Sequence, residues 1–396
     1  MFNLSSKRFI FFIIILLSSP AFSITGLFNL GFFPNEKLAI LLVAISKSAW
    51  REEFKQLRLI GFIISFILGC LFCIQIITGT SGIIQASINS IFIIASIPLY
   101  CSFLSARPNL TLQLIFFVGI LQLIISLFQQ YHSFSGNYDT AFIFNNYPPQ
   151  QGVYDYMVAE TGFWYRTAGL FFESSGYGLF QWLAIICALQ INIHKTLFGK
   201  IILFILILEV ILNGALTGYL FAFGFFVTKF LIKFKNRKNL IKALFNFPVI
   251  LILFYLIQAS NYYDFSGLTN KVIGQFDFLY NDNSYKVSRI RGMFESIQGS
   301  LGSDYVMFGA GFSWLNPTLD FYSLYIRAYG VAGFFCLVLF IFSILKKAPL
   351  YYGAAVFLAL SVNGHLSTSI NIIILSMSFV FYKIQQSTIN NEELKK

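Results

Sequence analysis

The chain consists of long apolar blocks separated by short polar or charged segments. The blocks are rich in Phe, Ile and Leu, and most are roughly 15–25 residues long, the length at which a helix crosses a hydrocarbon core of about 30 Å. Reading each block between charged residues, Gly, Pro or Asn predicts about twelve transmembrane helices. The predicted spans are 9–30, 38–50, 59–78, 83–104, 110–131, 169–191, 201–214, 216–232, 243–260, 321–345, 348–364 and 367–383. We therefore predict an all-α polytopic integral membrane protein, with a single multi-pass domain over residues 1–396.

The composition excludes soluble, disordered and disulfide-rich secreted proteins. Hydrophobic residues make up 57% of the 396 positions and charged residues only 11%. Soluble domains carry about a quarter charged residues, so this chain has too little polar surface to cover a water-soluble globule. The net charge of +11 leaves nucleic acid or membrane orientation as its explanation.

The distribution of charge along the chain favours membrane orientation. Twelve spans that begin inside place alternate loops in the cytoplasm, and those loops hold 20 basic and 4 acidic residues, a balance of +16. The opposite face holds 7 basic and 11 acidic residues, a balance of −4, and Glu209 lies within a span. Basic residues concentrate in cytoplasmic loops of membrane proteins. We therefore predict both termini in the cytoplasm, with the lipid bilayer and no nucleic acid as partner.

The N-terminal segment is open to a second interpretation. Lys7-Arg8, an apolar run and Ala21-Phe22-Ser23 also resemble a cleavable signal sequence. Cleavage would leave eleven spans with every later loop on the same side. We expect this segment to be retained as the first helix.

Two long loops are predicted on the outer face, at 132–168 and 261–320. Long polar segments on one face of a helical bundle are where binding and catalysis concentrate. Basic residues occur in or beside these loops, against the positive-inside tendency, and they are Arg166, Lys271, Lys286, Arg289, Arg291 and Arg327. Binding of an anion would explain them. The alternative is pairing with the loop acids, which include Asp155, Glu160, Asp282 and Glu295.

Arg166 begins a motif at the start of a predicted span, Arg166-Thr-Ala-Gly169-Leu-Phe-Phe-Glu173-Ser-Ser-Gly176-Tyr-Gly178. Arg166 and Glu173 are seven residues apart, about two helical turns, and could share one face. The glycines permit close backbone approach or a broken helix, which is tolerated at membrane depth only where it lines a cavity or is buried in protein. A guanidinium there can grip phosphate with two parallel hydrogen bonds, as lysine cannot.

Several motifs together resemble the bacterial O-antigen polymerases, the Wzy family. Arg-x-x-Gly-Leu-Phe-x-Glu at Arg166–Glu173 resembles the first-loop motif of the family, although Ser174 stands where the family usually has Pro. Leu212-Asn-Gly-Ala-Leu-Thr217-Gly218 resembles its Ser/Thr-Gly break between adjacent spans. The second loop offers further segments similar to the family's loop-to-helix region, namely Arg289-x-Arg291-Gly-Met-Phe-Glu295, Gly309-x-Gly311, Asp320 and Gly330-x-x-Gly333. The resemblance covers roughly residues 100–345.

The resemblance implies a GT-C-like helical membrane enzyme that transfers glycan at the outer, periplasmic side of the bacterial cytoplasmic (inner) membrane. Its substrates would be undecaprenyl-diphosphate-linked oligosaccharides. The growing O-antigen or capsular glycan would leave its lipid diphosphate and join the incoming lipid-linked repeat unit. A flippase and a chain-length regulator of the same pathway are implied partners.

The residues expected to carry this chemistry lie in the two loops and at their edges. The catalytic set is Arg166 and Arg289, which would stabilise the departing diphosphate, and Glu173, which would take the acceptor proton or orient Arg166. The substrate-binding set is Arg291, Arg327, Gly169, Asp320 and His365. The outer loops hold no Asp-x-Asp pair or His cluster, and the chain has no phosphate-binding Gly-x-x-x-x-Gly-Lys-Ser/Thr motif, so we expect neither metal nor cofactor. Glu209 is expected to face the bundle and pair with a polar neighbour such as Asn213 or Thr217.

Two alternatives remain open. An O-antigen ligase would have a similar topology, but ligases carry a His in the long second loop and residues 261–320 contain none. A flippase or other transporter suits twelve spans, although no repeat of two six-span halves is evident.

Overall fold

The computed structural model describes Ile13 and residues 35–79, 84–137, 167, 169, 174–213, 216–233, 306–311, 321–360 and 369–393. Over these ranges the chain forms helices and no strand. The predicted spans 9–30, apart from Ile13, and 243–260 lie outside them, as do most of the two long loops. The prediction of an all-helical protein is therefore confirmed for the described part.

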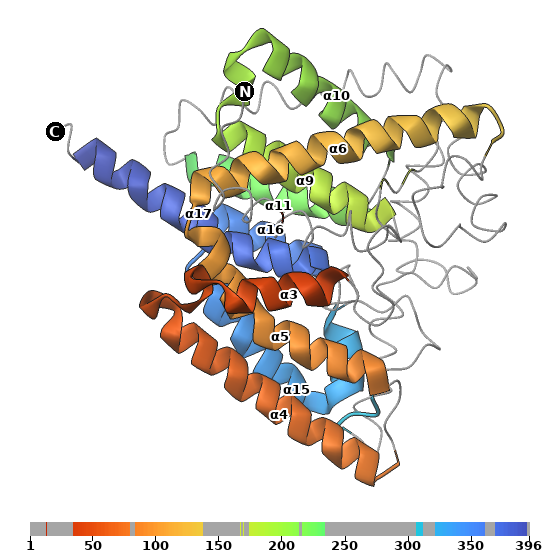
Figure 1. Ribbon diagram of the computed structural model, residues 1–396, viewed down its shortest axis with the longest axis vertical. Helices are drawn as coiled ribbons and strands as arrows, with labels where there is room; N and C mark the ends of the chain where they lie inside the picture. Colours follow the sequence, from red (N-terminus) through yellow and green to blue (C-terminus); the bar gives the residue numbers. More distant parts are fainter. Residues whose placement is uncertain are drawn as a thin grey trace.

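The α-helices of the described part overlap the other ten predicted spans (Figure 1). They are α3 (Asn35–Ile45), α4 (Lys55–Ile77), α5 (Ile84–Ser105), α6 (Pro108–Phe134), α9 (Ser174–Gln190), α10 (Leu197–Asn213), α11 (Leu216–Lys233), α15 (Phe321–Leu345), α16 (Leu350–Leu360) and α17 (Ser369–Glu393). Short 3₁₀ turns occur at η2 (Lys47–Trp50), η3 (Glu52–Phe54) and η4 (Ile193–Lys195).

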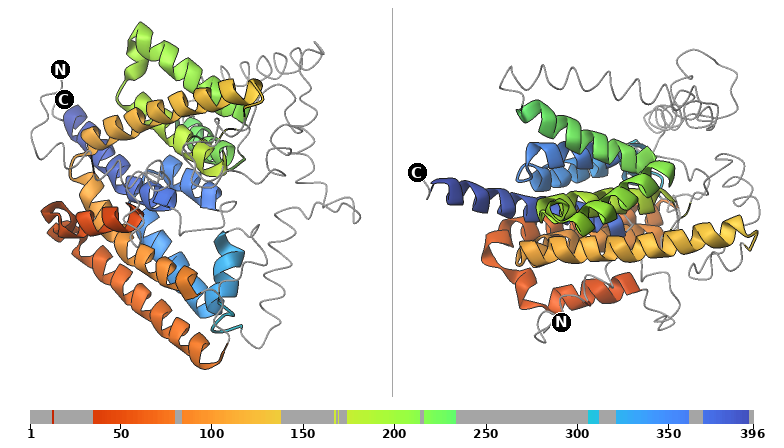
Figure 2. Two further views of the ribbon diagram at one scale, coloured as in Figure 1. Left: turned by 45° about the vertical axis from the view of Figure 1, so that its right-hand side comes forward. Right: turned by 90° about the horizontal axis from the view of Figure 1, so that it is seen from above.

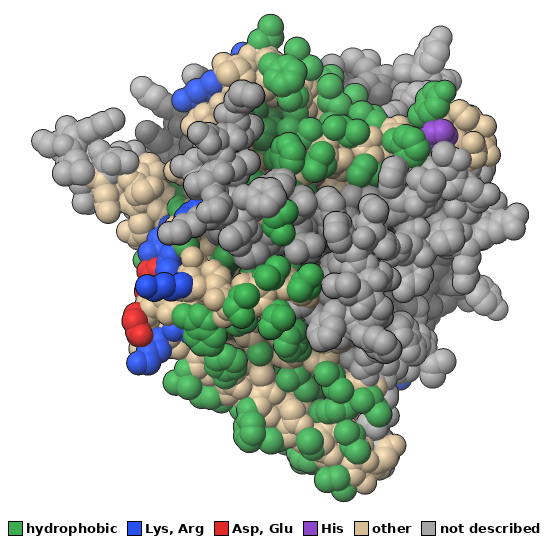
Figure 3. All heavy atoms as spheres, in the orientation of Figure 1, with side chains coloured by type: hydrophobic (Ala, Val, Ile, Leu, Met, Phe, Trp, Pro, Cys, Tyr) green, Lys and Arg blue, Asp and Glu red, His purple; other side chains and the backbone are tan. Residues whose placement is uncertain are grey.

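Within the described ranges, four segments are long and apolar enough to cross a membrane. They are Glu52–Ile77, Ser87–Ser105, Pro108–Phe134 and Leu324–Leu345, and the shorter apolar helices are Gly176–Gln190, Thr217–Ile232 and Leu350–Leu360. Large apolar side chains such as Phe66, Ile77 and Phe198 are more than 70% exposed, which suits contact with lipid chains. Figure 3 shows apolar side chains over much of the visible surface. The chain is therefore a helical membrane protein, and the number of twelve spans stays a prediction.

Two helices end well away from the ends of the spans predicted for them. The span predicted at 38–50 ends as an α-helix at Ile45, because Ser46 is extended and its side chain accepts a hydrogen bond from the Ser48 N–H, which starts η2. The last span was predicted to end at 383, where charge appears, but α17 continues to Glu393. The helix therefore extends about ten residues into a polar stretch beyond its apolar part.

Helices α9 and α17 form the centre of the bundle. From Tyr177 to Ala188 all side chains of α9 except the half-buried Trp182 are buried, and α17 is buried from Ile370 to Phe381. Helix α9 packs against α6, α10 and α11, whereas α17 packs against α5, α15 and α16. Figure 1 and the left-hand view of Figure 2 place α6, α9 and α10 in one group and α4, α5 and α15 in another.

Basic residues gather where the ends of several helices meet. Helix α4 begins beside Lys55, α5 ends before Arg107, and α15 ends before Lys346. Lys and Arg side chains lie along one edge of the face in Figure 3. We call this edge the basic end. It matches the side predicted as cytoplasmic from the sequence, although the orientation in a membrane stays a prediction.

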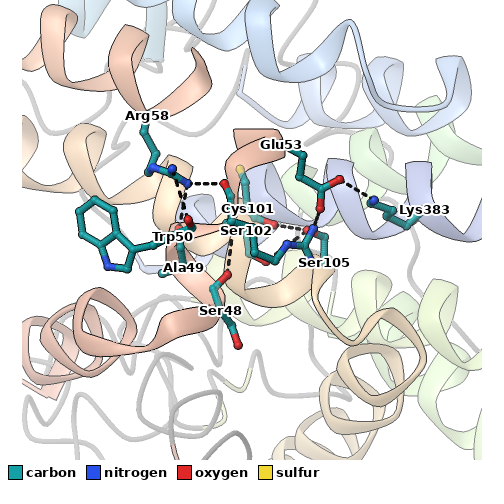
Figure 4. Close-up of polar contacts among 10 residues, drawn as sticks. Ser48, Ala49, Trp50, Glu53, Arg58, Cys101, Ser102, Ser105 and Lys383 are labelled. Carbon is teal, nitrogen blue, oxygen red and sulfur yellow. Dashed lines mark hydrogen bonds and ion pairs between the residues drawn. The ribbon is translucent and has the colours of Figure 1, made fainter. Parts of the chain in front are cut away.

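Contacts at the basic end are structural (Figure 4). Arg58 is buried, and its guanidinium donates to the carbonyls of Ala49 at 3.2 Å and Arg51 at 2.8 Å. Glu53 pairs with both Arg51 and Lys383, the latter at 2.7 Å. Partial burial lowers the pKa of Arg51, but a guanidinium stays protonated at any physiological pH. These contacts fix the turn between α3 and α4 against the bundle, in addition to any role in orientation.

Candidate functional site

The structure describes two of the eight predicted site residues, Gly169 and Arg327. The other six lie outside the described residues, and they are Arg166, Glu173, Arg289, Arg291, Asp320 and His365. Both described residues belong to places where buried polar side chains hold irregular backbone. The candidate site is built from these two places.

Gly169 is buried in a conformation that only glycine adopts readily. Its φ is +56°, and a Cβ there would lie 2.4 Å from Gln122 Oε1 and 2.8 Å from Tyr177 Cδ2. The side-chain amide of Gln129 holds the Gly169 backbone from both sides. It accepts the Gly169 N–H at 3.0 Å and donates to the Gly169 carbonyl at 2.7 Å. The glycine of the first-loop motif is therefore locked to α6 by two hydrogen bonds.

Thr167 is held by side chains of two helices, α6 and α10. Its hydroxyl lies 2.5 Å from Ser126 Oγ of α6 and 3.3 Å from Glu209 Oε1 of α10. Asn213, also on α10, donates to the Thr167 carbonyl at 2.7 Å and to its hydroxyl at 3.1 Å. Thr167 and Gly169 flank a single residue, so the chain immediately after Arg166 is fixed at two positions.

Glu209 is the acceptor on which these hydrogen bonds converge. Its carboxylate is 2% exposed and accepts from Ser126 at 2.6 Å and, through the other oxygen, from Tyr177 at 2.6 Å. Gln181 donates to Tyr177 Oη at 3.0 Å and to the Gly119 carbonyl at 3.1 Å. The expectation that Glu209 faces the bundle is confirmed. Its hydrogen-bond partners are Ser126, Thr167 and Tyr177, and Asn213 joins them through Thr167.

We call this set of side chains the Glu209 cluster. Its members are Ser126, Gln129, Thr167, Tyr177, Gln181, Glu209 and Asn213, and all are buried. Losing one partner of a buried hydrogen bond leaves the other polar group unsatisfied, which costs about 1–3 kcal/mol. The cluster can therefore hold the first-loop motif at a fixed depth in the bundle.

The glycines near Gly176 support close packing instead of a break. Helix α9 runs from Ser174 to Gln190 through Gly176 and Gly178. A Cβ on Gly218 of α11 would lie 2.8 Å from the backbone carbonyl of Gly178, so the two helices touch at their glycines. The break predicted between adjacent spans at Leu212–Gly218 does occur, since α10 ends at Asn213 and α11 begins at Leu216.

The second place joins two glycine segments from the far part of the chain. Helix α15 is kinked at Gly330, where φ is +66° and ψ is −174°. Residues 306–311 lie along the kink, with hydrogen bonds from Ala310 N–H to the Arg327 carbonyl at 2.8 Å and from Val331 N–H to the Val306 carbonyl at 2.9 Å. A Cβ on Gly309 or Gly330 would lie 2.5 Å or less from backbone of the other segment. Gly309-x-Gly311 and Gly330 are therefore one packed unit.

Gln75 of α4 fastens this unit to the bundle. Its amide nitrogen lies 2.6 Å from both the Phe308 and the Ala328 carbonyls. Arg327 precedes Ala328, and its side chain is partly buried. On the same helix, Tyr325 hydrogen-bonds with Ser90 of α5 at 2.9 Å. The structure thus holds the backbone at Arg327 as firmly as it holds the backbone after Arg166.

Both places lie at the helix ends opposite to the basic end. Ser126 and Gln129 are near the end of α6, about 27–32 Å along the helix from its first residue at 1.5 Å per residue. Tyr177 is near the start of α9, and Gln75 is near the end of α4. This is the side on which the sequence predicts the two long loops.

Sequence reasoning missed Gln129, Ser126, Tyr177 and Gln75. Their signal was available, because glutamine and serine inside apolar helices require partners at membrane depth. The partners that hold the motif and its cluster could not be read, since they lie 32 or more residues away along the chain. The described part of the chain holds no group of three or more His, Cys, Asp or Glu residues arranged to bind a metal ion.

Comparison with protein-family models, with curated proteins and with solved structures found no match to this chain.

Proposed function

We propose that this protein polymerises oligosaccharide repeat units carried on undecaprenyl diphosphate, at the outer face of the bacterial cytoplasmic membrane. It would be a membrane glycosyltransferase of the Wzy type. The observation that carries the proposal is the convergence of buried polar side chains on Thr167 and Gly169. These two residues belong to Arg166-Thr-Ala-Gly169-Leu-Phe-Phe-Glu173, the motif on which the resemblance to O-antigen polymerases mainly rests.

Buried polar clusters in a membrane bundle are costly and mark functional regions. Here two helices, α6 and α10, supply side chains that hold a motif containing one arginine and one carboxylate. The packed segments at Gly309–Gly311 and Gly330, next to Arg327 in the structure, add further irregular backbone on the same side of the bundle. An enzyme that grips a lipid diphosphate needs cationic side chains on rigid supports at that depth, and this arrangement supports such a role.

In the proposed reaction the growing glycan is the donor. The bond between its first sugar carbon and the diphosphate oxygen breaks, and that carbon bonds to a hydroxyl of the incoming lipid-linked repeat unit. Arg166 and Arg289 stabilise the negative charge that develops on the departing diphosphate. Glu173 takes the proton from the attacking hydroxyl. Arg291, Arg327, Gly169, Asp320 and His365 complete the substrate-binding region.

The diphosphate leaving group supplies the driving force, so the reaction needs no nucleotide or other cofactor. The lipid substrates would come from a flippase, and a chain-length regulator would act on the product. Both termini would lie in the cytoplasm, with the basic end facing inward.

Deletion of the gene, followed by gel analysis of the surface polysaccharide, tests the proposal. We expect lipid A–core capped with a single repeat unit, and long chains on complementation with the intact gene. Bare core with accumulated lipid-linked polymer would instead indicate a ligase. Loss of both polymer and single-unit caps would indicate a flippase.

Arg166→Ala tests the role of the motif within the same strain. It should abolish elongation at an unchanged protein level in the membrane, and Arg166→Lys should restore elongation poorly because lysine cannot form two parallel hydrogen bonds with phosphate. Normal long chains with Arg166→Ala would refute the role of this residue.

A further inference from the structure

Two buried side chains have a geometry that the proposed chemistry does not explain. Gln129 is fully buried. Its side-chain nitrogen and its side-chain oxygen each form a hydrogen bond with the backbone of Gly169. Glu209 is 2% exposed, and its two oxygens accept hydrogen bonds from Ser126, Thr167 and Tyr177. A charged or amide side chain in a membrane bundle is retained for a reason, since it costs free energy to bury.

Neither side chain is placed to touch a substrate. The oxygens of Glu209 are enclosed by three hydroxyl groups, and Gln129 faces backbone. What they do contact is the chain on either side of Ala168. Thr167 follows Arg166 directly, and consecutive Cα atoms are 3.8 Å apart. Fixing Thr167 and Gly169 therefore restricts where the Cα of Arg166 can lie.

We propose that Gln129 and Glu209 are positioning residues for Arg166: Gln129 of α6 holds the backbone of Gly169, Glu209 of α10 holds the hydroxyl of Thr167, and together they set the place from which the guanidinium acts. The consequence for catalysis rests on the proposed function of Arg166. The effect on the position of residue 166 does not depend on that proposed function. A misplacement of about 1 Å in an active site can lower the rate about 100-fold, so a grip of this kind is functionally important.

The geometric part is tested by thiol labelling at position 166. Full-length Arg166→Cys protein in membranes is treated with a membrane-impermeant maleimide, and the parent protein with its native cysteines gives the blank. Gln129→Leu is then added, which removes both hydrogen bonds to Gly169 at similar volume. The matched control is Thr111→Val, which removes one buried hydrogen bond, to the Leu104 carbonyl at 2.8 Å, near the other end of the same helix.

We expect Gln129→Leu to change the labelling rate at position 166 severalfold and Thr111→Val to leave it unchanged. Equal rates with and without Gln129→Leu would overturn the proposal. So would an equal change in both variants, because that indicates a general loosening of packing. Should Gln129→Leu fail to accumulate in the membrane, Gln129→Glu replaces it, since a carboxylate still accepts the Gly169 N–H but cannot donate to the Gly169 carbonyl.

The functional part is tested by comparing substitutions of Glu209 in the deletion strain. Glu209→Leu removes every acceptor, and we expect about 10- to 100-fold less polymer per unit of protein. Glu209→Gln keeps the shape and one acceptor oxygen, and should retain most of the polymer. Adding Tyr177→Phe to Glu209→Gln removes the hydroxyl that would face the new amide group, and should lower activity no further.

Glu209→Gln as inactive as Glu209→Leu would overturn a positioning role, because it would show that the negative charge itself is required. Failure of the proposed function is recognised separately. In that case Arg166→Ala leaves the polysaccharide unchanged, whereas the labelling rates still report whether Gln129 positions residue 166.

Discussion

Replacement of Gly169 by alanine separates the contributions that hold the first-loop motif. The backbone at Gly169 has φ of +56°, where an L-residue costs about 1–2 kcal/mol. The added methyl group would lie 2.4 Å from Gln122 Oε1 and 2.8 Å from the Tyr177 ring, and overpacking of this kind costs about 1–3 kcal/mol. We expect Gly169→Ala to lower the free energy of unfolding by about 2–5 kcal/mol.

Two other glycines provide matched controls. Gly136 has φ of +71° with nothing within 4 Å of an added Cβ, so Gly136→Ala should cost only the backbone strain of about 1–2 kcal/mol. Gly69 lies within α4 with open space around it, and Gly69→Ala should stabilise the helix by about 0.5–1 kcal/mol. Gly169→Ala therefore reports backbone strain together with overpacking, Gly136→Ala reports backbone strain alone, and Gly69→Ala reports neither.

The measurement is unfolding of the purified protein in mixed micelles by titration with sodium dodecyl sulfate, followed by tryptophan fluorescence. From the most to the least stable, the expected order of the variants is Gly69→Ala, Gly136→Ala and Gly169→Ala. Equal stability of Gly136→Ala and Gly169→Ala would refute the packing of the motif against Gln122 and Tyr177.

Three further predictions use the same titration. Gly330→Ala should lower the free energy of unfolding by about 3 kcal/mol, because φ is +66° and the Cβ would lie 2.4 Å from the Met307 carbonyl; a loss below about 0.5 kcal/mol would contradict the packed kink. Gln75→Leu should lower the free energy of unfolding by about 1–3 kcal/mol, since it leaves the Phe308 and Ala328 carbonyls without this donor. An unchanged midpoint of the unfolding titration would contradict these two hydrogen bonds. Arg58→Lys should lower the free energy of unfolding by about 1–3 kcal/mol, because lysine lacks the forked guanidinium that reaches several carbonyls. Lys55→Ala, at an exposed position, should change it by no more than about 0.5 kcal/mol. Equal effects of the two substitutions would refute the structural role of Arg58.

The sequence predicted the helices of the described part well because a membrane helix is specified locally. An apolar block must satisfy its backbone internally, so its length and its charged ends define the helix. Ends were predicted less well where other effects decide. Ser46 turns the chain after Ile45 through a local hydrogen bond, and α17 continues beyond Lys383 through a polar stretch that the apolar pattern does not mark.

The candidate site was predictable only in part. Gly169 could be recognised as a place that permits close backbone approach or a broken helix, whereas Gly309 and Gly330 were recognised only as parts of segments that resemble a family motif. That Gly309 packs on Gly330, or that Gln129 holds Gly169, could not be derived, since these contacts join distant segments. Glu209 was expected to be buried from its position inside an apolar run, but its partners Ser126 and Tyr177 come from two other helices.

The most direct test of the proposed function is reconstitution of the purified protein in phospholipid vesicles with undecaprenyl-diphosphate-linked repeat units as the only sugar source. The products are separated by size, and released undecaprenyl diphosphate is measured in parallel. We expect a ladder of lipid-linked polymers with one undecaprenyl diphosphate released per linkage, and no ladder with Arg166→Ala. Intact repeat units with the active preparation, and no released undecaprenyl diphosphate, would contradict the account.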